Sequence, residues 1–367
     1  MIDRHVIRVL RIQKMNLPRD CLHSIFWFLP LADLARVSNA CRNWHRAVTL
    51  LRPQPHVERA FLFPTEIACE HARTSALLLH ITHVRFAPFV FDTPSAIAML
   101  QANRNVAYID IREDALVKDD RVEKLARQIT MQPMLCSLRM HLFCSDNSLA
   151  SLVHAIRSTA ITHLHWTNIQ FQKRGFNGVC TQTFANMFST MHTLCSVNLS
   201  QNDINYKQAQ QLLCGLAQNP NLTHLDISSN NLGDICLLDV AKILTTCKQL
   251  TYLNLSDNLL ISIRMLTDAI AKNPSLVHLE VSNNFLCESS FFAIAKALAS
   301  NTHLQTLTIS YIPAFMLSIK QLAHAIQSNE SLTHLDFSGG FAFQHDDQHV
   351  LEAILFENKR LKKIIFE

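Results

Sequence analysis

Four similar stretches decide the fold of this chain: LCSVNLSQNDI at residues 194–204, LTHLDISSNNL at 222–232, LTYLNLSDNLL at 250–260 and LVHLEVSNNFL at 276–286. Each follows the template Leu-x-x-Leu-x-Leu-x-x-Asn-x-Leu, with Val or Ile at some of the leucine positions. Four consecutive matches leave little room for chance, and repetition at a fixed period is typical of proteins built from stacked units. The sequence therefore predicts a repeat array.

Weaker copies of the template extend the array in both directions. Their first residues are Ile81, Val106, Leu135, Ile161, Leu304 and Leu332, and a last strand starts at Leu361. The mean step between the eleven starts is 28 residues, which leaves room for a helix of about three turns after each strand. We therefore predict an α/β solenoid over residues 78–367, with about 10–11 units, a parallel inner sheet and outer helices.

Asparagines recur at two places in each unit. We expect those of the template to hydrogen-bond the backbone of their own turns. A second set lies three residues before strand starts, where we expect a left-handed backbone conformation to end each helix. This second set comprises Asn103, Asn219, Asn273, Asn301, Asn329 and Asn358.

The repeat is interrupted at two places. The step from Ile161 to Leu194 is 33 residues long and contains residues 173–178 with two glycines, which predict a protruding loop. Near the C-terminus, Ile312 and Gly340 replace the template asparagine. Aromatic residues flank both positions: Tyr311, Phe315, Phe341 and Phe343. These aromatic residues could form either a binding patch or a hydrophobic cap.

The repeats resemble the ribonuclease-inhibitor-like class of leucine-rich repeats, which implies a horseshoe over about residues 78–367. Residues 15–50 follow a different pattern, because Leu22, Ile25, Phe26 and Leu29 have helical spacing. We predict three short helices in this segment. So short a segment cannot bury all its large apolar side chains internally, and we expect part of that surface to need a partner.

Read in order, the segment contains a series of short motifs: Leu17-Pro18, Ile25-Phe26, Phe28-Leu29-Pro30, Asp33-Leu34, Val37-Ser38 and Cys41-Arg42-x-Trp44. This order resembles the F-box motif. The resemblance implies a three-helix domain that binds the Skp-type adaptor of cullin-RING ubiquitin ligases. The contact residues implied are Leu17, Pro18, Ile25, Phe26, Leu29, Pro30 and Leu34. We divide the remainder into a basic arm at 1–14 and a linker or N-terminal cap at 51–77.

The order of the two parts resembles that of F-box/leucine-rich-repeat substrate receptors. It implies a non-enzymatic adaptor of a Skp-cullin-F-box ubiquitin ligase, located in the cytoplasm, whose repeats hold an unknown target. The asparagine-type repeats look more like F-box mimics that intracellular bacteria secrete, which implies an effector in the host cytoplasm. The alternative is a binding or inhibitory repeat protein without a role in ubiquitin transfer, in which residues 15–50 form only a helical cap.

Template positions 2, 3, 5, 7 and 8 are expected to face away from the core on the inner sheet. Early units present basic residues there, interrupted by Asp110 and Glu113: Arg85, Arg112, Arg139 and His165. Later units present the candidate target-binding residues: Asp226, Tyr252, Asp257, Glu280, Tyr311 and Asp336. This distribution favours a target with a basic face that accepts aromatic side chains. Ordinary solvated polarity is the other interpretation.

Composition excludes several classes of function. The chain has 367 residues, a net charge of +4 and eleven cysteines, with no Cys-x-x-Cys pair and no zinc spacing. We expect no cofactor, no nucleic acid and no membrane span. The arm at 1–14 holds Arg4, Arg8, Arg11 and Lys14. We interpret it as a solvated tail in preference to a membrane or RNA contact.

Two features of the sequence resemble a metal site and a catalytic cysteine, and we expect neither. Histidines occupy the third template position in five units: His83, His163, His224, His278 and His334. Because they recur with the repeat, we predict a polar surface row and no metal site. The tripeptide Cys144-Ser145-Asp146 matches the Cys-x-Asp motif of some secreted ubiquitin ligases. It lies inside a repeat unit, so we predict that Cys144 is not catalytic.

Overall fold

The computed structural model describes residues 61–63, 81–86, 90–167, 169, 178–311, 316–338, 356 and 358–365. The predicted arm, the F-box and its contact residues lie outside the described residues. So do most of the predicted loop at 173–178 and the residues Ile312, Phe315, Gly340, Phe341 and Phe343. The chain divides into unit 1, Met1–Ile161, and unit 2, Thr162–Glu367.

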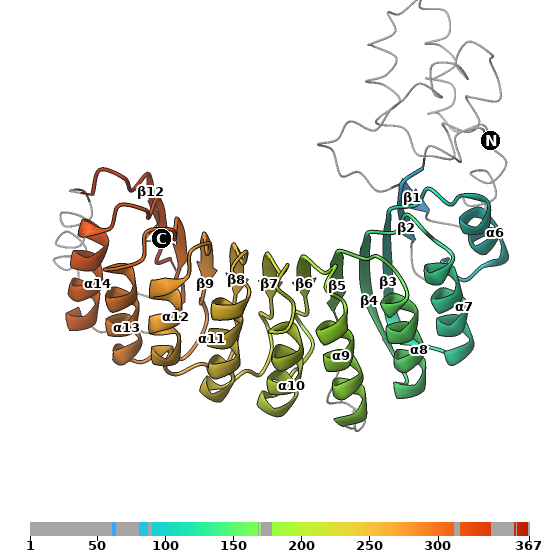
Figure 1. Ribbon diagram of the computed structural model, residues 1–367, viewed down its shortest axis with the longest axis horizontal. Helices are drawn as coiled ribbons and strands as arrows, with labels where there is room; N and C mark the ends of the chain where they lie inside the picture. Colours follow the sequence, from blue (N-terminus) through green and yellow to red (C-terminus); the bar gives the residue numbers. More distant parts are fainter. Residues whose placement is uncertain are drawn as a thin grey trace, which may run out of the picture. The chain divides into compact units, whose positions relative to one another are not determined.

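The described residues of unit 1 form four parallel strands in sequence order. They are β1 (Phe61–Phe63), β2 (His83–Phe86), β3 (Tyr108–Val117) and β4 (Ser137–Cys144). Its helices lie on one side of the strands (Figure 1) and are α6 (Pro94–Ala102), α7 (Asp119–Thr130) and α8 (Asp146–Arg157). The segment 51–77, which we expect to be a linker or N-terminal cap, contains β1, and Phe61 pairs in register with Val84. Part of that segment is a strand of the sheet.

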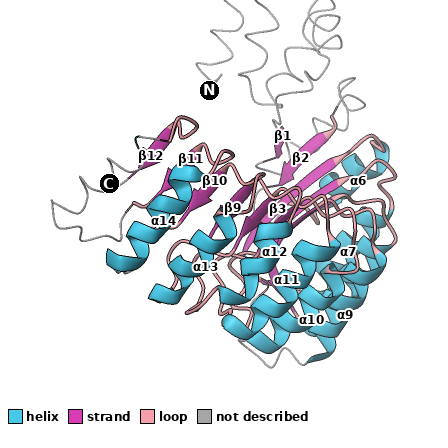
Figure 2. Cartoon of the chain, turned by 60° about the vertical axis from the view of Figure 1, so that its left-hand side comes forward, coloured by secondary structure: helices cyan, strands magenta, loops and turns pink. Residues whose placement is uncertain are grey.

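Unit 2 repeats the same alternation. Its eight parallel strands are β5 (His163–Thr167), β6 (Ser196–Asn198), β7 (His224–Asp226), β8 (Tyr252–Asn254), β9 (His278–Glu280), β10 (Thr306–Thr308), β11 (His334–Asp336) and β12 (Lys363–Ile365). Its helices cover one side of this sheet (Figure 2). They are α9 (Gly178–Thr190), α10 (Tyr206–Leu216), α11 (Leu237–Thr246), α12 (Thr267–Lys272), α13 (Glu288–Leu298) and α14 (Met316–Ser328). Short 3-10 turns, η2 (Asp234–Cys236) and η3 (Arg264–Leu266), precede α11 and α12.

The predicted solenoid is confirmed strand by strand. Each strand from β2 to β12 begins two residues after a predicted unit start. The helices mostly have the predicted length, although α12 has only six residues. No helix among the described residues is long and apolar enough to cross a membrane.

The leucines of the template form the core. Leu250, Leu253 and Leu255 are fully buried, and so are their counterparts in neighbouring units. Facing them, α10 buries Ala209, Leu212, Leu213 and Leu216, the residues that have helical spacing in the sequence. Burial of one such leucine side chain stabilises the fold by about 1.5–3 kcal/mol. Each repeat, one strand with its helix, therefore depends on the neighbouring repeats to cover its apolar face.

The template asparagines hydrogen-bond turn backbone, as predicted. The buried Nδ2 of Asn258 donates to the carbonyls of Leu255 and Ser256 in its own turn, both at 3.0 Å. It also donates to Ile227 of the preceding unit at 3.2 Å, while its Oδ1 accepts from the Leu232 N–H at 3.1 Å. The amide therefore closes its own turn and ties it to the previous one.

The prediction for the second set of asparagines is wrong. Asn103 and Asn273 have extended backbones, with φ of −113° and −71°, and none of the six has a positive φ. All six are buried. Five of the side chains instead donate to carbonyls of the preceding repeat, as Asn273 Nδ2 does to Leu244 O at 2.7 Å. Asn103 Nδ2 donates to Ile81 O, at the start of its own repeat, at 2.7 Å. These positions need an amide to join neighbouring units, and the helix ends there without a left-handed residue.

Five of the six left-handed non-glycine residues in the described part of the chain lie at template position 8, directly before the position of the template asparagine. Gln201, Ser229, Asp257, Asn283 and Tyr311 have φ between 49° and 60°, and the sixth residue, Asp203, lies at position 10 with φ of 52°. The five residues at position 8 make a sharp turn directly after β6–β10. An L side chain adopts this conformation at a cost, and the buried asparagine that follows stabilises the turn in the four units that have one.

Candidate functional site

The exposed side of the sheet in unit 2 carries two rows of polar side chains. In β6–β11 the middle residue is buried, whereas the first and third are partly or fully exposed. His224, Tyr252 and His278 are paired in register at the first position. Asp226, Asn254 and Glu280 are paired in register at the third. Neighbouring strands are about 4.8 Å apart, so each row forms a continuous surface.

Tyr252 lies at the centre of this surface. Its hydroxyl donates to Glu280 Oε1 at 3.0 Å and accepts from Asn254 Nδ2 at 3.4 Å. Burial and the adjacent Glu280 carboxylate raise the pKa of Tyr252 above its usual value. The phenol therefore stays protonated and holds Glu280 in place.

Two histidines enclose the Tyr252 ring. The His224 ring is stacked on it, with centroids 5.9 Å apart and planes at 22°, and the His278 ring is 6.2 Å away on the next strand. The Thr223 hydroxyl donates to Cys195 O at 2.8 Å and lies 2.8 Å from His224 Nδ1. Because that hydroxyl has a single proton, Nδ1 must be the donor to it. Burial first, then His163 and His278, lower the pKa of His224, so the ring presents Nε2 as an acceptor.

The carboxylates of Asp226 and Asp336 contact their own turns. Asp226 Oδ1 accepts from the N–H of Ser228 at 3.0 Å, and Asp336 Oδ1 accepts from the N–H of Ser338 at 2.8 Å. Asn254 makes the same contact with the N–H of Ser256 at 2.9 Å. The turn thus needs an oxygen at this position but not a negative charge. The charges of Asp226 and Asp336 are therefore not required by this turn contact.

The predicted target-binding residues do not form one cluster. The structure brings Asp226, Tyr252 and Glu280 together on β7–β9. Asp336 lies on β11, two strands beyond Glu280 in register. Asp257 and Tyr311 lie in the left-handed turns that follow β8 and β10. Tyr311 is 62% exposed, so it is the more accessible of the two tyrosines.

Sequence reasoning placed His224 and His278 in a polar surface row but did not predict their contacts with Tyr252. The signal was present, because His224, Tyr252 and His278 occupy the same template position in three consecutive units. Stacking follows from that register once the strands are parallel. Among the described residues, no group of three or more His, Cys, Asp or Glu side chains is placed to hold a metal ion.

Unit 1 presents a basic surface that differs from the predicted one. Asp110 is fully buried, and Arg85 Nε lies 2.6 Å and Arg112 Nη2 lies 3.4 Å from its Oδ2. The two arginines remain 38% and 49% exposed. Asp110 and Glu113 therefore do not interrupt the surface as exposed acids, because both are buried beneath it.

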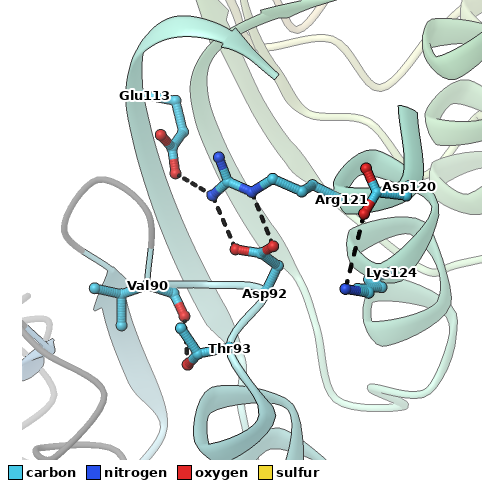
Figure 3. A network of polar contacts seen from close by, with 7 residues as sticks. All are labelled: Val90, Asp92, Thr93, Glu113, Asp120, Arg121 and Lys124. Atoms are coloured by element: carbon cyan, nitrogen blue, oxygen red, sulfur yellow. Dashed lines mark hydrogen bonds and ion pairs between the residues drawn. The ribbon is translucent and has the colours of Figure 1, made fainter. Parts of the chain in front are cut away.

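Glu113 belongs to an internal network in unit 1 (Figure 3). Arg121 on α7 donates from Nη2 to Asp92 Oδ1 at 2.8 Å and to Glu113 Oε1 at 3.0 Å. Arg121 Nε also lies 2.8 Å from Asp92 Oδ2, and the guanidinium lies over the Phe91 ring at 4.8 Å. This network joins β3, α7 and the segment before α6.

The tripeptide Cys144-Ser145-Asp146 lies at the junction between β4 and α8. Cys144 ends β4 and is buried, Ser145 is the N-cap of α8, and Asp146 is the first residue of that helix. The Ser145 hydroxyl accepts from the Ser148 N–H at 3.3 Å and donates to Asp119 Oδ1 at 2.6 Å. The tripeptide therefore makes the transition from a strand to a capped helix.

Two family matches agree with the two parts of the chain. F-box-like matches residues 15–51, and Leucine Rich repeat matches residues 218–235. Capping protein, Arp2/3 and myosin-I linker protein 3 of Mus musculus is 26% identical over 277 residues, which are 72% of this chain and 20% of that protein. NACHT, LRR and PYD domains-containing protein 3 of Homo sapiens is 23% identical over 230 residues, which are 61% of this chain and 22% of that protein.

Among solved structures, a chain of the Rad7 and Elc1 complex in yeast is similar with a TM-score of 0.52 and 15% identity. That match covers 94% of this chain and 85% of the other. This likeness concerns the fold. The chain spans about a fifth of the length of the curated relatives that it matches. By its two family matches and its fold, the chain joins an F-box-like segment to a leucine-rich-repeat array.

Proposed function

We propose that this protein is the substrate-recognition adaptor of a Skp-cullin-F-box ubiquitin ligase. The observation that carries the proposal is the F-box-like match at residues 15–51, in the same chain as a repeat array with an exposed polar and aromatic sheet surface. In this proposal the F-box segment binds a Skp-type adaptor through Leu17, Pro18, Ile25, Phe26, Leu29, Pro30 and Leu34. The array holds the target protein.

The proposed mechanism is proximity. An adaptor that binds both the ligase core and the target raises the effective concentration of the target beside the conjugating enzyme. It contributes no bond-making group. We accordingly propose that the protein is not an enzyme and that it acts in the cytoplasm, which is the host cytoplasm if a bacterium secretes it.

Co-purification of the full chain with a Skp-type adaptor tests the first half of the proposal. Replacing Leu17 and Pro18 by alanine is expected to abolish co-purification, because apolar anchors at such interfaces contribute about 2 kcal/mol or more each. Met134→Ala, which removes a 60% exposed apolar side chain of unit 1, is the control and should leave co-purification intact. Circular dichroism confirms that each variant is folded. Undiminished co-purification of the double variant contradicts the F-box assignment.

The second half of the proposal concerns the acidic surface of unit 2, which favours a target with a basic face. The sharpest variant combines Asp226→Asn, Glu280→Gln and Asp336→Asn, because each substitution removes a charge and keeps one oxygen that can accept a local hydrogen bond. At Asp226 it also removes the acceptor of the bond from Asn198 Nδ2, at 2.7 Å. Proximity labelling with ligase activity blocked is expected to lose the target. Asp120→Asn with Glu123→Gln, two exposed acids on α7, should leave labelling unchanged. Equal labelling by both variants would exclude the acidic surface as the binding site.

The variant Cys144→Ala tests the proposal that the protein is not an enzyme. We expect Cys144→Ala to leave any associated ubiquitin transfer intact, because the buried thiol ends a strand and lies beside a helix cap. The reaction is measured with the purified ligase core and the variant adaptor. Loss of transfer with folding and adaptor binding preserved would overturn the adaptor mechanism.

A binding or inhibitory repeat protein is the second candidate. In that case residues 15–50 serve as a cap, and the sheet surface alone carries the function. The same co-purification separates the two candidates, since a cap does not require a Skp-type adaptor.

A further inference from the structure

A second exposed surface lies at the edge of unit 2 where strands lead into helices. Six large apolar side chains there are about half exposed, and we call them the apolar strip. They are Ile235 at 48%, Leu238 at 57%, Leu259 at 47%, Ile261 at 56%, Met265 at 47% and Phe285 at 63%. Together they expose on the order of several hundred Å² of apolar surface, a size at which such patches are often functional.

Backbone hydrogen bonds join the loops that carry the strip. The Leu259 N–H donates to Leu232 O at 2.9 Å, and the Phe285 N–H donates to Leu260 O at 2.9 Å. The Ile261 N–H donates to Asp234 Oδ1 at 2.7 Å, directly beside Ile235. The loops of three successive repeats of unit 2 therefore lie side by side, and the strip extends across these three repeats.

The fold does not need these side chains to be apolar. The core positions of the same loops are filled by the buried Leu232, Leu260 and Leu286. At the template position of Leu259 and Phe285, the two preceding units have Asp203 and Asn231. The same backbone thus accepts polar residues there, and the apolar residues are confined to part of the edge.

Acidic residues border the strip. Asp239, Asp268 and Glu288 lie in the first turns of α11, α12 and α13, directly after the three loops. The exposed Asp257 lies two residues before Leu259, and Arg264 is the basic residue within the loops. Acids are favourable at helix N-termini in any protein. Here they also give an apolar surface a negative border.

We propose that the apolar strip is a docking surface for an amphipathic helix of a partner protein, with an apolar face flanked by basic residues. Successive units recur at about the strand spacing of 4.8 Å, close to the 5.4 Å pitch of an α-helix. A helix lying across the units would place one anchor residue of each turn on each loop. The negative border selects basic flanks. This surface is separate from the exposed side of the sheet, and its use does not depend on the F-box.

The probe is a designed 18-residue peptide with leucines on one helical face and lysines and arginines on the other, labelled for fluorescence anisotropy with the full chain. We expect binding that Leu259→Gln, Ile261→Gln and Phe285→Gln together weaken at least about tenfold. These side chains are about half exposed or more, so the variant should fold. The control is Leu116→Gln with Met131→Gln and Met134→Gln, which removes exposed apolar residues from unit 1 and should leave affinity unchanged.

Charge is tested separately. Asp239→Asn, Asp268→Asn and Glu288→Gln together are expected to weaken binding about threefold and to reduce its salt dependence. Equal binding of a peptide with glutamates in place of the basic residues would overturn the proposed partner chemistry. Loss of binding in the Asp226→Asn, Glu280→Gln variant would move the peptide to the sheet surface and overturn the site. A dimer in sedimentation that the glutamine variant of the strip abolishes would show that a second copy covers the strip, and would likewise overturn the proposal.

Discussion

In unit 1, β3 and β4 run for 10 and 8 residues, whereas β6–β11 in unit 2 have three residues each. The units of β3 and β4 have Asp114 and Phe143 at the template asparagine position. Neither Glu113 nor Leu142, the residues before these positions, is left-handed, and both strands continue. The asparagine is not the sole cause of a short strand, because β10 also has three residues and is followed by the left-handed Tyr311 without an asparagine after it. Unit 1 holds the end of β3 by other means.

Those other means are charges. Glu113 occupies in unit 1 the template position that turns left-handed in unit 2, and it pairs with Arg121 instead. Unit 1 thus has a network of ion pairs at the end of β3, whereas unit 2 has a series of neutral amides at its strand ends.

The largest effect is expected for Arg121→Met in unit 1. The substitution leaves Asp92 and Glu113, which are 14% and 1% exposed, without their cation, and breaking such a pair costs about 3 kcal/mol or more. Urea unfolding followed by circular dichroism measures the loss. Arg127→Met on the same helix removes an exposed pair with Glu123 and should change stability by less than about 0.5 kcal/mol. Equal effects of the two variants would show that the network does not hold unit 1.

Asn258→Ala tests unit 2 in the same assay. The variant leaves three buried carbonyls and the Leu232 N–H without this partner, so we expect a loss of about 2–3 kcal/mol. The control is Asn231→Ala. Asn231 follows Asn230, the template asparagine of the preceding repeat, and the same position is occupied by Leu259 in the next repeat. We expect this variant to lose less than about 1 kcal/mol of unfolding free energy. If Asn258→Ala were as mild as the control, the amide would not be a cause of the short strands.

Two glycines of unit 2, Gly215 and Gly233, differ in the space around them. A Cβ added to Gly215 on α10 would collide with the Ala185 carbonyl oxygen on α9, whereas one added to Gly233 would meet nothing within 4 Å. Gly215→Ala is expected to destabilise by about 1–2 kcal/mol through overpacking, despite the better helix propensity of alanine. Gly233→Ala should stay within about 0.5 kcal/mol of the native protein. Stabilisation by Gly215→Ala would mean that α9 and α10 are not in close contact.

The smallest effect is expected for Asp226→Asn. Asn198 and Asn254 make the same turn contact from neighbouring strands at 2.9 Å each. Asp226 Oδ2 also accepts from Asn198 Nδ2 at 2.7 Å, and the substitution removes that acceptor. Thermal and urea unfolding should therefore show a loss of no more than about 1 kcal/mol, the value of one hydrogen bond. A loss above about 2 kcal/mol would mean that the charge itself holds the turn.

The strand positions followed from the sequence because the template leucines are core residues and their spacing repeats. β1 was missed because Phe61–Phe63 lacks the template, although its pairing with β2 makes it part of the sheet. The conformation of Asn103 and Asn273 was predicted wrongly because asparagine tolerates a left-handed backbone at many helix ends. Here the side-chain amide donates to a backbone carbonyl far away in the sequence, Ile81 O for Asn103 and Leu244 O for Asn273, which a one-dimensional pattern does not reveal.

The candidate site was predictable only in part. Asp226, Tyr252 and Glu280 were assigned to the exposed side of the sheet from strand alternation alone, and the structure places them there. The hydrogen bond from Tyr252 to Glu280 and the buried position of Asp110 depend on side-chain geometry between strands. Those contacts decide which charges face solvent, and sequence spacing does not contain them.

The turn contact at the third strand residue has a consequence for how such a surface can evolve. Aspartate and asparagine satisfy the same N–H, as Asp226 and Asn254 do on adjacent strands. A single nucleotide change interconverts the two residues. The array can therefore gain or lose one negative charge per repeat while its stability stays nearly constant. Binding preference in this protein can drift from repeat to repeat along a scaffold that selection on folding leaves untouched.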